Sequence, residues 1–364
     1  TGFHTGTPRL FVSHFSHSLH TIMSNPTRAE SQKLEINKTS DQYYVDSYSH
    51  FGIHEEMLKD KVRTLAYRDA ILFNQASFKD KIVLDIGCGT GILSMFCAKA
   101  GAKHVYAIDM SDIIDQAREI VNLNGFGDKI TLIKGRVEDL TLPVDHVDII
   151  VSEWMGYFLL YESMLNTVLY ARDKWLRKDT GMILPNKARM YIAGIEDAEY
   201  KQDKIHYWDS VYGFDFSPIK KLALLEPLVD TLENSNQIIT TKSQLMDIDI
   251  MTVNKEDLDF IGKFSVDVRQ QDYLHAFVAW FDIDFTQGHK HVFFSTSPYS
   301  KYTHWKQTIF YLKDDLQVFK GDKIEGELDC KANKKNPREL DINIKVSFKG
   351  RQARSEHEQF YQLR

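Results

Sequence analysis

The chain has 364 residues, of which 43% are apolar and 26% are charged, values typical of a soluble protein with two packed domains. Its net charge of −6 argues against direct nucleic-acid binding, which requires a basic surface, and favours a basic substrate. Cys88, Cys97 and Cys330 fit neither a disulfide framework nor a zinc cluster, so we expect reduced thiols, an intracellular compartment and no metal. No apolar run is long enough for a transmembrane helix, and no membrane partner is expected.

The first 40 residues carry no clear folding signal. Positions 1–29 contain no Asp or Glu but several Ser and His, which gives them a loose likeness to a transit peptide. Arginine is sparse, however, and the first methionine is Met23. We therefore interpret residues 1–22 as leader or translated upstream sequence and expect disorder to about residue 40.

A phenol-rich segment, Tyr44-Val45-Asp46-Ser47-Tyr48, precedes a predicted helix at 55–73. The helix is indicated by apolar residues at helical spacing, with acidic residues early and Arg68 late, as the helix dipole favours. Asp60 and Arg63 are three positions apart, so they would share one helix face and form a weak surface ion pair.

A short β-branched run at 81–86 is followed by glycines at 87, 89 and 91 and by a predicted helix that continues to Ala100. This order is typical of the first strand, turn and helix of a doubly wound sheet, in which ligands bind at the carboxyl ends of the strands. The G-x-G-x-G spacing, with Asp85 two residues before the first glycine, differs from the dinucleotide pattern G-x-G-x-x-G. It is the pattern of S-adenosylmethionine binders.

Further alternating elements predict a parallel α/β sheet. Strands are expected at 104–109, 130–134 and 147–153, and a helix at 113–122. The second strand ends in Asp109, an acid that can accept hydrogen bonds from both ribose hydroxyls. The turn after the third strand would place Val137 and Glu138 beside an adenine.

The fourth strand leads into the run Ser152–Glu162, in which two carboxylates, Glu153 and Glu162, flank aromatic and aliphatic residues. Burying a carboxylate costs several kcal/mol or more unless a cation compensates. No Lys or Arg lies between the two, so we predict a cation from outside the chain, and an arginine guanidinium fits because carboxylates can grip it on more than one side. The alternative is a helix-capping acid and a surface acid that flank a core segment.

After about Pro185 the pattern changes to half-buried strands, among them 292–295, 323–328 and 340–348. The second half is therefore predicted to be an antiparallel barrel or sandwich. The segment 196–228 interrupts it, is rich in aromatic residues, and is expected to be helical at first and then irregular. It is too apolar to lie in solvent, which indicates an arm that docks on another subunit.

Together these motifs resemble those of the protein arginine methyltransferases of type I, which make asymmetric dimethylarginine, in a fungal or other simple eukaryotic version. The resemblance covers residues 43–364 and rests on the glycine loop with Asp109, the run 152–162, the segment 44–48 and the segment 302–307. It implies a Rossmann-like domain at 41–185 that binds S-adenosyl-L-methionine and releases S-adenosyl-L-homocysteine. A β-barrel substrate domain at 186–364 would follow, with a dimerisation arm at 196–228.

The resemblance also implies partners and a location. The substrates would be arginine side chains in Arg/Gly-rich RNA-binding proteins and histone tails. The enzyme would be a homodimer or higher oligomer in the nucleus and cytoplasm.

Each matching residue receives a role from the resemblance. Those assigned to the cofactor are Asp85, Gly87, Gly89 and Gly91 (cradle), Asp109 (ribose), Val137 and Glu138 (adenine), Arg63 (methionine carboxylate), and Tyr44 and His54 nearby. Those assigned to the reaction are Glu153 and Glu162 (guanidinium clamp), His304 with Asp60 (acid/base pair), Tyr48 (closure of the site), and Met57 and Met164 (product type). Val45 stands where the family usually has Phe, and Asp109 is one methylene shorter than the usual Glu, so we expect somewhat weaker cofactor binding with the reaction retained.

Two other functions are compatible with this fold. A methyltransferase acting on amino groups of nucleic acid carries an Asn/Asp-Pro-Pro-Tyr/Phe run after the fourth strand, whereas this chain has Ser152-Glu153-Trp154-Met155 there. A non-catalytic scaffold of the same fold would be expected to have lost a paired glutamate or the glycine loop, and both are intact.

Overall fold

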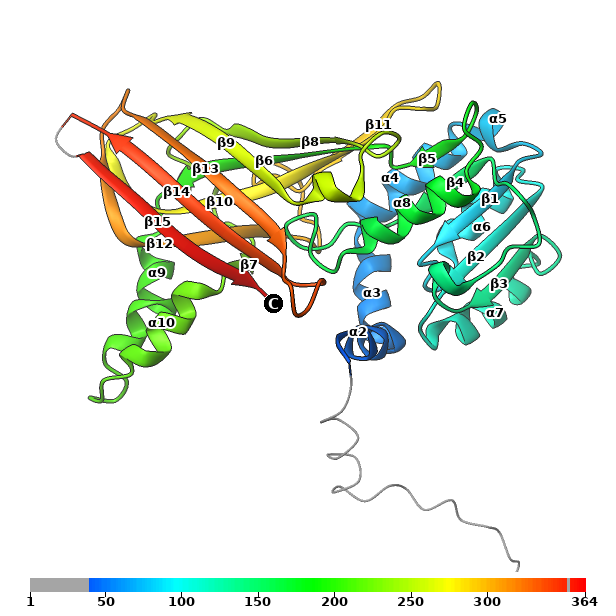
Figure 1. Cartoon of the computed structure of the whole chain (residues 1–364), viewed down its shortest axis with the longest axis horizontal. Helices are drawn as coiled ribbons and strands as arrows, with labels where there is room; N and C mark the ends of the chain where they lie inside the picture. The colour runs from blue at the N-terminus through cyan, green and yellow to red at the C-terminus, as the bar shows by residue number, and fades with distance from the viewer. Residues whose placement is uncertain (1–38, 352–353) are drawn as a thin grey trace, which may run out of the picture. The chain divides into compact units, whose positions relative to one another are not determined.

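The structure is a computed structural model that describes residues 39–351 and 354–364 (Figure 1). Within it, Ser40–Arg364 form one compact unit. The expectations of a leader at 1–22 and of disorder to about residue 40 fall almost entirely on residues 1–38, which lie outside the described residues.

The described part begins with helices α2 (Ser40–Ser49), α3 (Phe51–Lys59), α4 (Lys61–Leu72) and α5 (Gln75–Phe78). The prediction of one helix at 55–73 is wrong, because Asp60 has extended backbone dihedral angles (φ −67°, ψ 96°) and separates α3 from α4. Its carboxylate Oδ1 accepts a hydrogen bond from the backbone N–H of Arg63 at 3.0 Å and so caps the start of α4. The predicted Asp60–Arg63 ion pair is therefore also wrong, since Asp60 binds the backbone of Arg63.

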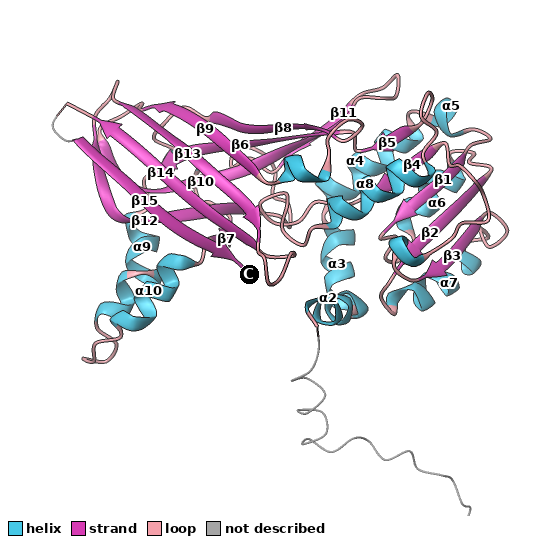
Figure 2. Cartoon of the chain, in the orientation of Figure 1, coloured by secondary structure: helices cyan, strands magenta, loops and turns pink. Residues whose placement is uncertain are grey.

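The predicted parallel sheet is confirmed, with strand order β3-β2-β1-β4-β5 (Figure 2). Its strands are β1 (Ile82–Ile86), β2 (His104–Asp109), β3 (Ile130–Lys134), β4 (Ile149–Ser152) and β5 (Met182–Leu184). The helical segments that follow or connect them are α6 (Ile92–Lys99), α7 (Ile113–Leu123), η1 (Val137–Asp139) and α8 (Met164–Trp175). From β1 the chain adds β2 and β3 on one side and then β4 and β5 on the other, so the strand order switches between β1 and β4. The carboxyl ends of these two neighbours form the switch point at which ligands bind in such sheets.

The second half consists of two antiparallel sheets, as predicted. One has the order β7-β12-β10-β6-β8, with β11 paired to β10, and the other has the order β15-β14-β13-β9. The strands are β6 (Lys187–Ile195), β7 (Leu228–Asp230), β8 (Ser243–Asp249), β9 (Phe260–Asp267), β10 (Asp272–Phe285), β11 (Val292–Ser295), β12 (Gln307–Val318), β13 (Lys323–Ala332), β14 (Leu340–Lys349) and β15 (Arg354–Leu363). Short 3-10 turns, η3 (Ser235–Gln237) and η4 (Lys255–Leu258), connect some of them.

The inserted segment forms an arm of α9 (Ala198–Lys204), η2 (His206–Asp209) and α10 (Ser217–Leu225), which projects from the sheet edge in Figure 1. The expectation of irregular structure after the first helix is wrong for α10, which begins with Pro218 in its first turn, where proline is preorganised for a helix. The base of the arm packs on an apolar cluster that includes Ile195, Ile205, Trp280 and Tyr311. This cluster explains why β10 is buried on both faces rather than alternating.

A continuous apolar core joins the two halves of the chain. The ring of Tyr67 from α4 packs edge-on against Phe285 of β10, and the indole of Trp305 donates a hydrogen bond to the carbonyl of Met155 at 2.8 Å. Phe158, from the loop after β4, packs edge-on against Phe310 of β12. The loop with the paired glutamates is therefore supported by the barrel core.

The structure also bears on the cysteines, on membrane-spanning helices and on metal sites. Cys88, Cys97 and Cys330 are free and buried. Within residues 39–351 and 354–364, no helix has the length and apolar character needed to cross a membrane. The same part of the chain contains no group of three or more His, Cys, Asp and Glu side chains that could hold a metal ion.

Replacing Phe310 tests whether the barrel core supports the loop that carries the paired glutamates. The ring is fully buried between Phe158 and Tyr361, so Phe310→Ala leaves a cavity and should lower the free energy of unfolding by about 3–5 kcal/mol. Phe360→Ala removes a ring that is 44% exposed and should lower it by less than about 1 kcal/mol. Calorimetric melting of both variants checks the difference, and equal shifts in the melting midpoint would contradict a core that links the two halves.

Candidate active site

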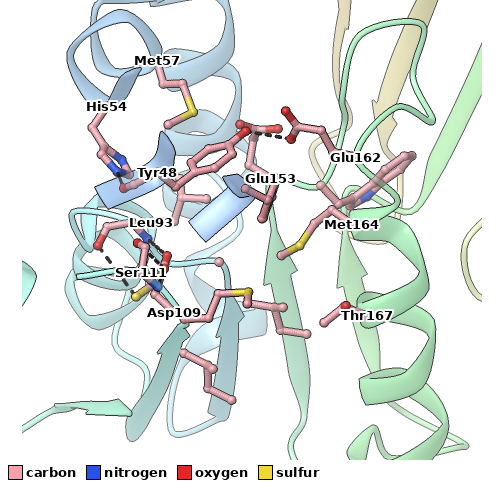
Figure 3. A pocket seen from close by; sticks show the side chains of 18 of the residues that line it. Tyr48, His54, Met57, Leu93, Asp109, Ser111, Glu153, Glu162, Met164 and Thr167 are labelled. Carbon is pink, nitrogen blue, oxygen red and sulfur yellow. Dashed lines mark hydrogen bonds between the residues drawn. The ribbon is translucent and has the colours of Figure 1, made fainter. Parts of the chain in front are cut away.

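A pocket opens at the carboxyl ends of β1, β2 and β4, beneath the N-terminal helices (Figure 3). The structure brings most of the predicted site residues to its wall, which includes Tyr44, Val45, Tyr48, His54, Met57, Arg63, Gly87, Gly89, Asp109, Val137, Glu138, Glu153, Glu162, Met164 and His304. Figure 3 shows Glu153, Glu162 and Tyr48 toward one end of this pocket and Asp109 with Ser111 toward the other.

The glycine loop brings bare backbone to the pocket wall. Gly87 and Gly89 both have left-handed dihedral angles (φ 69° and 53°). A Cβ atom at Gly87 would lie 2.8 Å from the Met164 methyl carbon, and one at Gly89 would lie 3.1 Å from Nδ1 of His54. A side chain at either position would therefore fill the space where a ligand must lie.

Asp109 ends β2 with its carboxylate fixed by the adjacent backbone. Its Oδ2 accepts a hydrogen bond from the N–H of Gly89 at 2.8 Å. Its Oδ1 accepts from the backbone N–H and the hydroxyl of Ser111 at 2.8 and 2.7 Å. These bonds orient the carboxylate without using all of its acceptor positions, so it can also accept from the hydroxyls of a ribose.

Val137 and Glu138 lie in the 3-10 turn after β3. Val137 is buried, and Oε1 of Glu138 accepts a hydrogen bond from the hydroxyl of Thr167 at 2.8 Å. An apolar wall beside an acceptor of fixed direction suits the flat ring and exocyclic amine of an adenine.

Asp85 and Gly91, also predicted for the cradle, do not line the pocket. Asp85 is fully buried behind the glycine loop, where burial raises the pKa of its carboxyl to about 7 and Ser94 donates a hydrogen bond to it at 2.6 Å. Gly91 has φ 84° at the start of α6. Both residues shape the loop from outside the ligand space.

Glu153 is paired with Arg63, which corrects the prediction that its compensating cation comes from outside the chain. The Nε of Arg63 lies 2.9 Å from Oε2 of Glu153, and the two side chains are only 7% and 8% exposed. Oε1 of Glu153 is buried and has no hydrogen-bond partner among the described residues. Such an orphaned carboxylate oxygen, aimed into a pocket, calls for a donor from a ligand.

Glu162 faces the same end of the pocket from a strained loop. Phe158, Leu159, Glu162 and Ser163 all have positive φ, which non-glycine residues adopt only when the surroundings hold them there. The hydroxyl of Tyr48 donates a hydrogen bond to Oε2 of Glu162 at 2.8 Å. Burial raises the pKa of Glu162 to about 7, and the charge of Glu153 also raises it, while the Tyr48 bond lowers it.

His304 and Asp60 form the predicted pair. Oδ2 of Asp60 lies 2.8 Å from Nδ1 of His304 and also accepts a hydrogen bond from the His304 backbone N–H at 2.9 Å. Although burial opposes ionisation, these bonds and the one from the backbone of Arg63 hold the pKa of Asp60 below its ordinary value. Asp60 does not line the pocket, so it acts through His304, which does.

The remaining predicted residues close the pocket from above and from the side. Nε2 of His54 lies 2.7 Å from the carbonyl oxygen of Tyr48, which ties α3 to the end of α2. Met57 and Met164 contribute thioethers. The methyl carbon of Met164 lies beside Gly87, and Figure 3 shows Met57 near the Tyr48 ring. Val45 lines the pocket with a side chain smaller than the usual Phe.

These residues fit S-adenosylmethionine. Asp109, the bare glycine backbone and the Val137–Glu138 turn suit a ribose and an adenine at one end. At the other end, Arg63 donates from Nε to Glu153 and from Nη1 to the carbonyl of Met57, at 3.3 Å. Its Nη2 makes no hydrogen bond to any described residue and is the donor left for a carboxylate.

Sequence reasoning missed several residues of the wall, among them Ser111, Arg136, Thr167 and Arg338. Ser111 follows Asp109 by two residues, and a serine at that spacing after a strand-end acid is a local signal that could have found it. Arg338 lies between β13 and β14 and is 176 residues from Glu162, whose carbonyl oxygen it contacts. No local sequence pattern predicts a contact between residues so far apart in the chain.

Known proteins resemble the chain along most of its length. Residues 83–179 match the family described as a methyltransferase domain, and residues 186–351 match the arginine methyltransferase oligomerization subdomain. Protein arginine N-methyltransferase 1 of Chlamydomonas reinhardtii is 58% identical over 328 residues, which cover 90% of this chain and 94% of that protein. Its namesake in Schizosaccharomyces pombe is 58% identical over 318 residues, which cover 87% of this chain and 93% of that protein.

A solved structure shares the fold at high identity. The Trypanosoma brucei PRMT1 enzyme–prozyme heterotetrameric complex with AdoHcy superposes with a TM-score of 0.85 at 51% identity and covers 88% of this chain and 100% of that chain. The identity over nearly the whole chain, together with a pocket that holds paired glutamates opposite a glycine loop, settles the family. The chain belongs to the protein arginine N-methyltransferases.

Proposed function

We propose that this chain uses S-adenosyl-L-methionine to methylate the terminal guanidino nitrogens of arginine in proteins, giving monomethylarginine and then asymmetric dimethylarginine. The observation that carries the proposal is the placement of two carboxylates, the buried Glu153 and the half-buried Glu162, at one end of a pocket whose other end fits the cofactor. S-adenosylmethionine supplies an electrophilic methyl group on a sulfonium and leaves as S-adenosylhomocysteine.

The chemical difficulty is that a guanidinium is a poor nucleophile. Its pKa is above about 12, so full deprotonation at neutral pH would cost roughly 7 kcal/mol. Two carboxylates on different sides of the group avoid most of this cost. They attract the positive charge toward the nitrogens they contact and leave electron density on the remaining terminal nitrogen.

Glu153 and Glu162 are built to contact different nitrogens. Oε1 of Glu153 lacks a partner among the described residues, while Arg63 holds its other oxygen in place. Glu162 accepts a hydrogen bond from the hydroxyl of Tyr48 on Oε2, and a carboxylate has further acceptor positions for a guanidinium. Fixing the guanidinium in line with the methyl group supplies much of the remaining rate acceleration.

The proton released from the substrate nitrogen has two routes. Glu162, with a pKa raised by burial to about 7, can accept it directly. His304, oriented by Asp60, can accept it through its second ring nitrogen. On the first route, the raised pKa of Glu162 lets its carboxyl return the proton to solvent near neutral pH.

Product type follows from the space beside the reacting nitrogen. Met57 and Met164 line this region with flexible thioethers, which leave room for a methylated nitrogen to return for a second transfer. This supports the asymmetric product over the symmetric one.

The family's oligomerization subdomain supports assembly of this chain, and we propose a homodimer as its smallest active form. The arm carries exposed aromatic residues at its tip, with Tyr212 94% and Phe214 69% exposed. Two such exposed rings two positions apart in the sequence are unusual on a surface that stays in solvent. A second copy of the chain is the partner for this surface.

We propose Arg/Gly-rich RNA-binding proteins and histone tails as substrates, and the nucleus and cytoplasm as the compartments. The net charge of −6 favours basic segments of this kind. Glycines beside the target arginine would also let the substrate backbone approach the recessed glutamates.

The test of the function is incubation with labelled S-adenosylmethionine and an Arg/Gly-rich peptide, followed by mass-spectrometric identification of the product. We expect monomethylarginine early and asymmetric dimethylarginine later. Glu153→Gln should lower kcat by at least about 100-fold, because it removes the charge while keeping the shape. The Kd of this variant for S-adenosylhomocysteine, measured by calorimetry, should stay within a few-fold of the native value.

Symmetric dimethylarginine would overturn the proposed product type. Undiminished turnover in Glu153→Gln would overturn the clamp and leave the cofactor assignment standing.

The pH dependence of kcat/KM should report the ionisation of Glu162 in the free enzyme. Only the carboxylate attracts the guanidinium, and it forms above its pKa, so kcat/KM should rise through about pH 7 and then level off. Tyr48→Phe removes a hydrogen bond that lowers the pKa of Glu162 and should therefore move this rise to higher pH.

The matched control for the pH experiment is Tyr299→Phe, which alters an exposed phenol that does not line the pocket. It should leave the profile unchanged. A Tyr48→Phe profile that coincides with it would show that Glu162 does not govern the rise.

The arm can be tested by replacing its two most exposed aromatics. Tyr212→Ser with Phe214→Ser should convert dimers into monomers, as measured by light scattering, because both rings are exposed in one copy and would be buried between two. Ile261→Ser on β9 removes a comparably exposed apolar side chain outside the arm and should leave the mass unchanged. A stable dimer of the double variant would refute the role of the arm tip.

A further inference from the structure

The loop between β13 and β14, residues 333–339, brings Arg338 from the barrel to the wall of the pocket. None of the roles described above uses this residue. It is the one arginine besides Arg63 and Arg136 that lines the pocket within the described residues. Its contacts join elements that are far apart in the sequence.

The loop is held in one conformation by its own polar side chains. Oδ1 of Asn333 accepts hydrogen bonds from the backbone N–H groups of Lys335 and Asn336 at 2.9 and 3.0 Å. Its amide nitrogen donates to Asp341 at 3.0 Å, and its backbone N–H donates to the carbonyl of Glu339 at 2.9 Å. Asparagine turns of this kind fix a short loop, so Arg338 is presented from a defined position.

Arg338 and its neighbour hold the backbone of Glu162. Nη1 of Arg338 donates to the carbonyl oxygen of Glu162 at 2.7 Å, and the N–H of Glu162 donates to the carbonyl of Arg338 at 2.7 Å. The hydroxyl of Ser163 donates to the carbonyl of Pro337. Glu162 and Ser163 have φ of 73° and 59°, a left-handed conformation that is unfavourable for residues other than glycine. The loop therefore stabilises the strained turn that aims the Glu162 carboxylate.

The same guanidinium also holds α2. Its central carbon lies 3.9 Å from the centroid of the Tyr44 ring, a cation–π contact with the helix that covers the pocket. Helix α2 is tied to the site a second time by the hydrogen bond from Tyr48 to Glu162. Arg338 thus links the barrel, the Glu162 turn and the covering helix.

We propose that Arg338 is a positioning residue for the methyl transfer proposed above, which fixes the Glu162 turn and holds α2 closed over the pocket through Tyr44. Its contacts are with the backbone of Glu162 and the ring of Tyr44, so it acts through these two residues. The inference rests on the proposed function and extends the site to the far end of the chain.

The charge of Arg338 has a second effect on Glu162. Burial and the nearby Glu153 raise the pKa of Glu162, while the Tyr48 hydrogen bond, the positive charge of Arg338 and a hydrogen bond from Tyr44 lower it. The phenols of Tyr157 and Tyr161 also lie within electrostatic range of Glu162, whose charge contributes to raising their pKa values. Removing the positive charge should therefore leave Glu162 protonated over a wider pH range.

The first experiment needs no activity. Hydrogen–deuterium exchange is measured on the full chain for the native protein, Arg338→Gln, Arg338→Lys and the control Lys335→Gln, whose exposed side chain lies in the same loop. Amides of α2 should exchange about tenfold faster in Arg338→Gln, because the contact with Tyr44 is lost. Amides in the core strand β1 should be unchanged in every variant, which excludes general unfolding.

The second experiment measures kcat/KM against pH for the same four proteins. Arg338→Gln should lower kcat by about tenfold and move the acidic rise to higher pH by about half a unit. Arg338→Lys keeps the charge but not the planar contacts, so it should retain the native pH profile while α2 still exchanges faster. Lys335→Gln should match the native protein in both experiments.

These outcomes separate the two proposals. A native protein that does not methylate arginine would overturn the proposed function. A native protein that is active, with Arg338→Gln equal to Lys335→Gln in exchange and pH profile, would overturn the role of Arg338. So would a loss of activity in Arg338→Gln that is accompanied by faster exchange throughout β1, because that is a general loss of stability.

Discussion

The buried pair of Arg63 and Glu153 is the interaction on which the rest of the site depends. A carboxylate at 8% exposure cannot stay charged beside apolar residues without a cation, and Arg63 supplies it from one side. Because Arg63 takes only one oxygen of Glu153, the other remains available. The pocket then holds two acids at one end, with Arg63 on Glu153 and Arg338 near Glu162. The open oxygen of Glu153 still needs a donor, and an incoming guanidinium supplies one, which gives the site a physical reason to prefer arginine.

The pair exists because the N-terminal helices are not one rod. The break at Asp60 turns α4 away from α3, so that Arg63, in the first turn of α4, reaches Glu153. The same break frees the Asp60 carboxylate to cap α4 and to bind His304, a residue 244 positions away. One residue outside helical geometry therefore positions both a cation and a base. Its cost is offset by the hydrogen bonds that its carboxylate accepts.

The sequence predicted what is local and missed what is tertiary. The parallel sheet, the glycine loop and the acid at the end of β2 each arise from residues within a few positions of one another, and the structure confirms these elements. The break at Asp60 escaped because the apolar pattern continues across it, and no local feature outweighs a continuous apolar stripe. The partner of Glu153 escaped for a different reason. An arginine 90 residues earlier can be assigned to it only once the fold is known. Helix α10 was missed because the aromatic residues that precede Pro218 dominate the pattern of the whole segment.

The division into a cofactor half and a substrate half does not describe the chemistry of the site. His304 and Arg338 both lie within residues 186–351, the part that matches the oligomerization subdomain. The chain returns from the arm through β7, whose Asp230 pairs with Gln307 at the start of β12, three residues after His304. Trp305 then fixes this segment to the carbonyl of Met155 beside the paired glutamates. At the base of the arm, Tyr311 of β12 donates a hydrogen bond to Asp197 at 2.6 Å. The strand that anchors the arm is therefore also the strand that begins beside the base, so any partner that orders the arm also constrains the backbone next to His304.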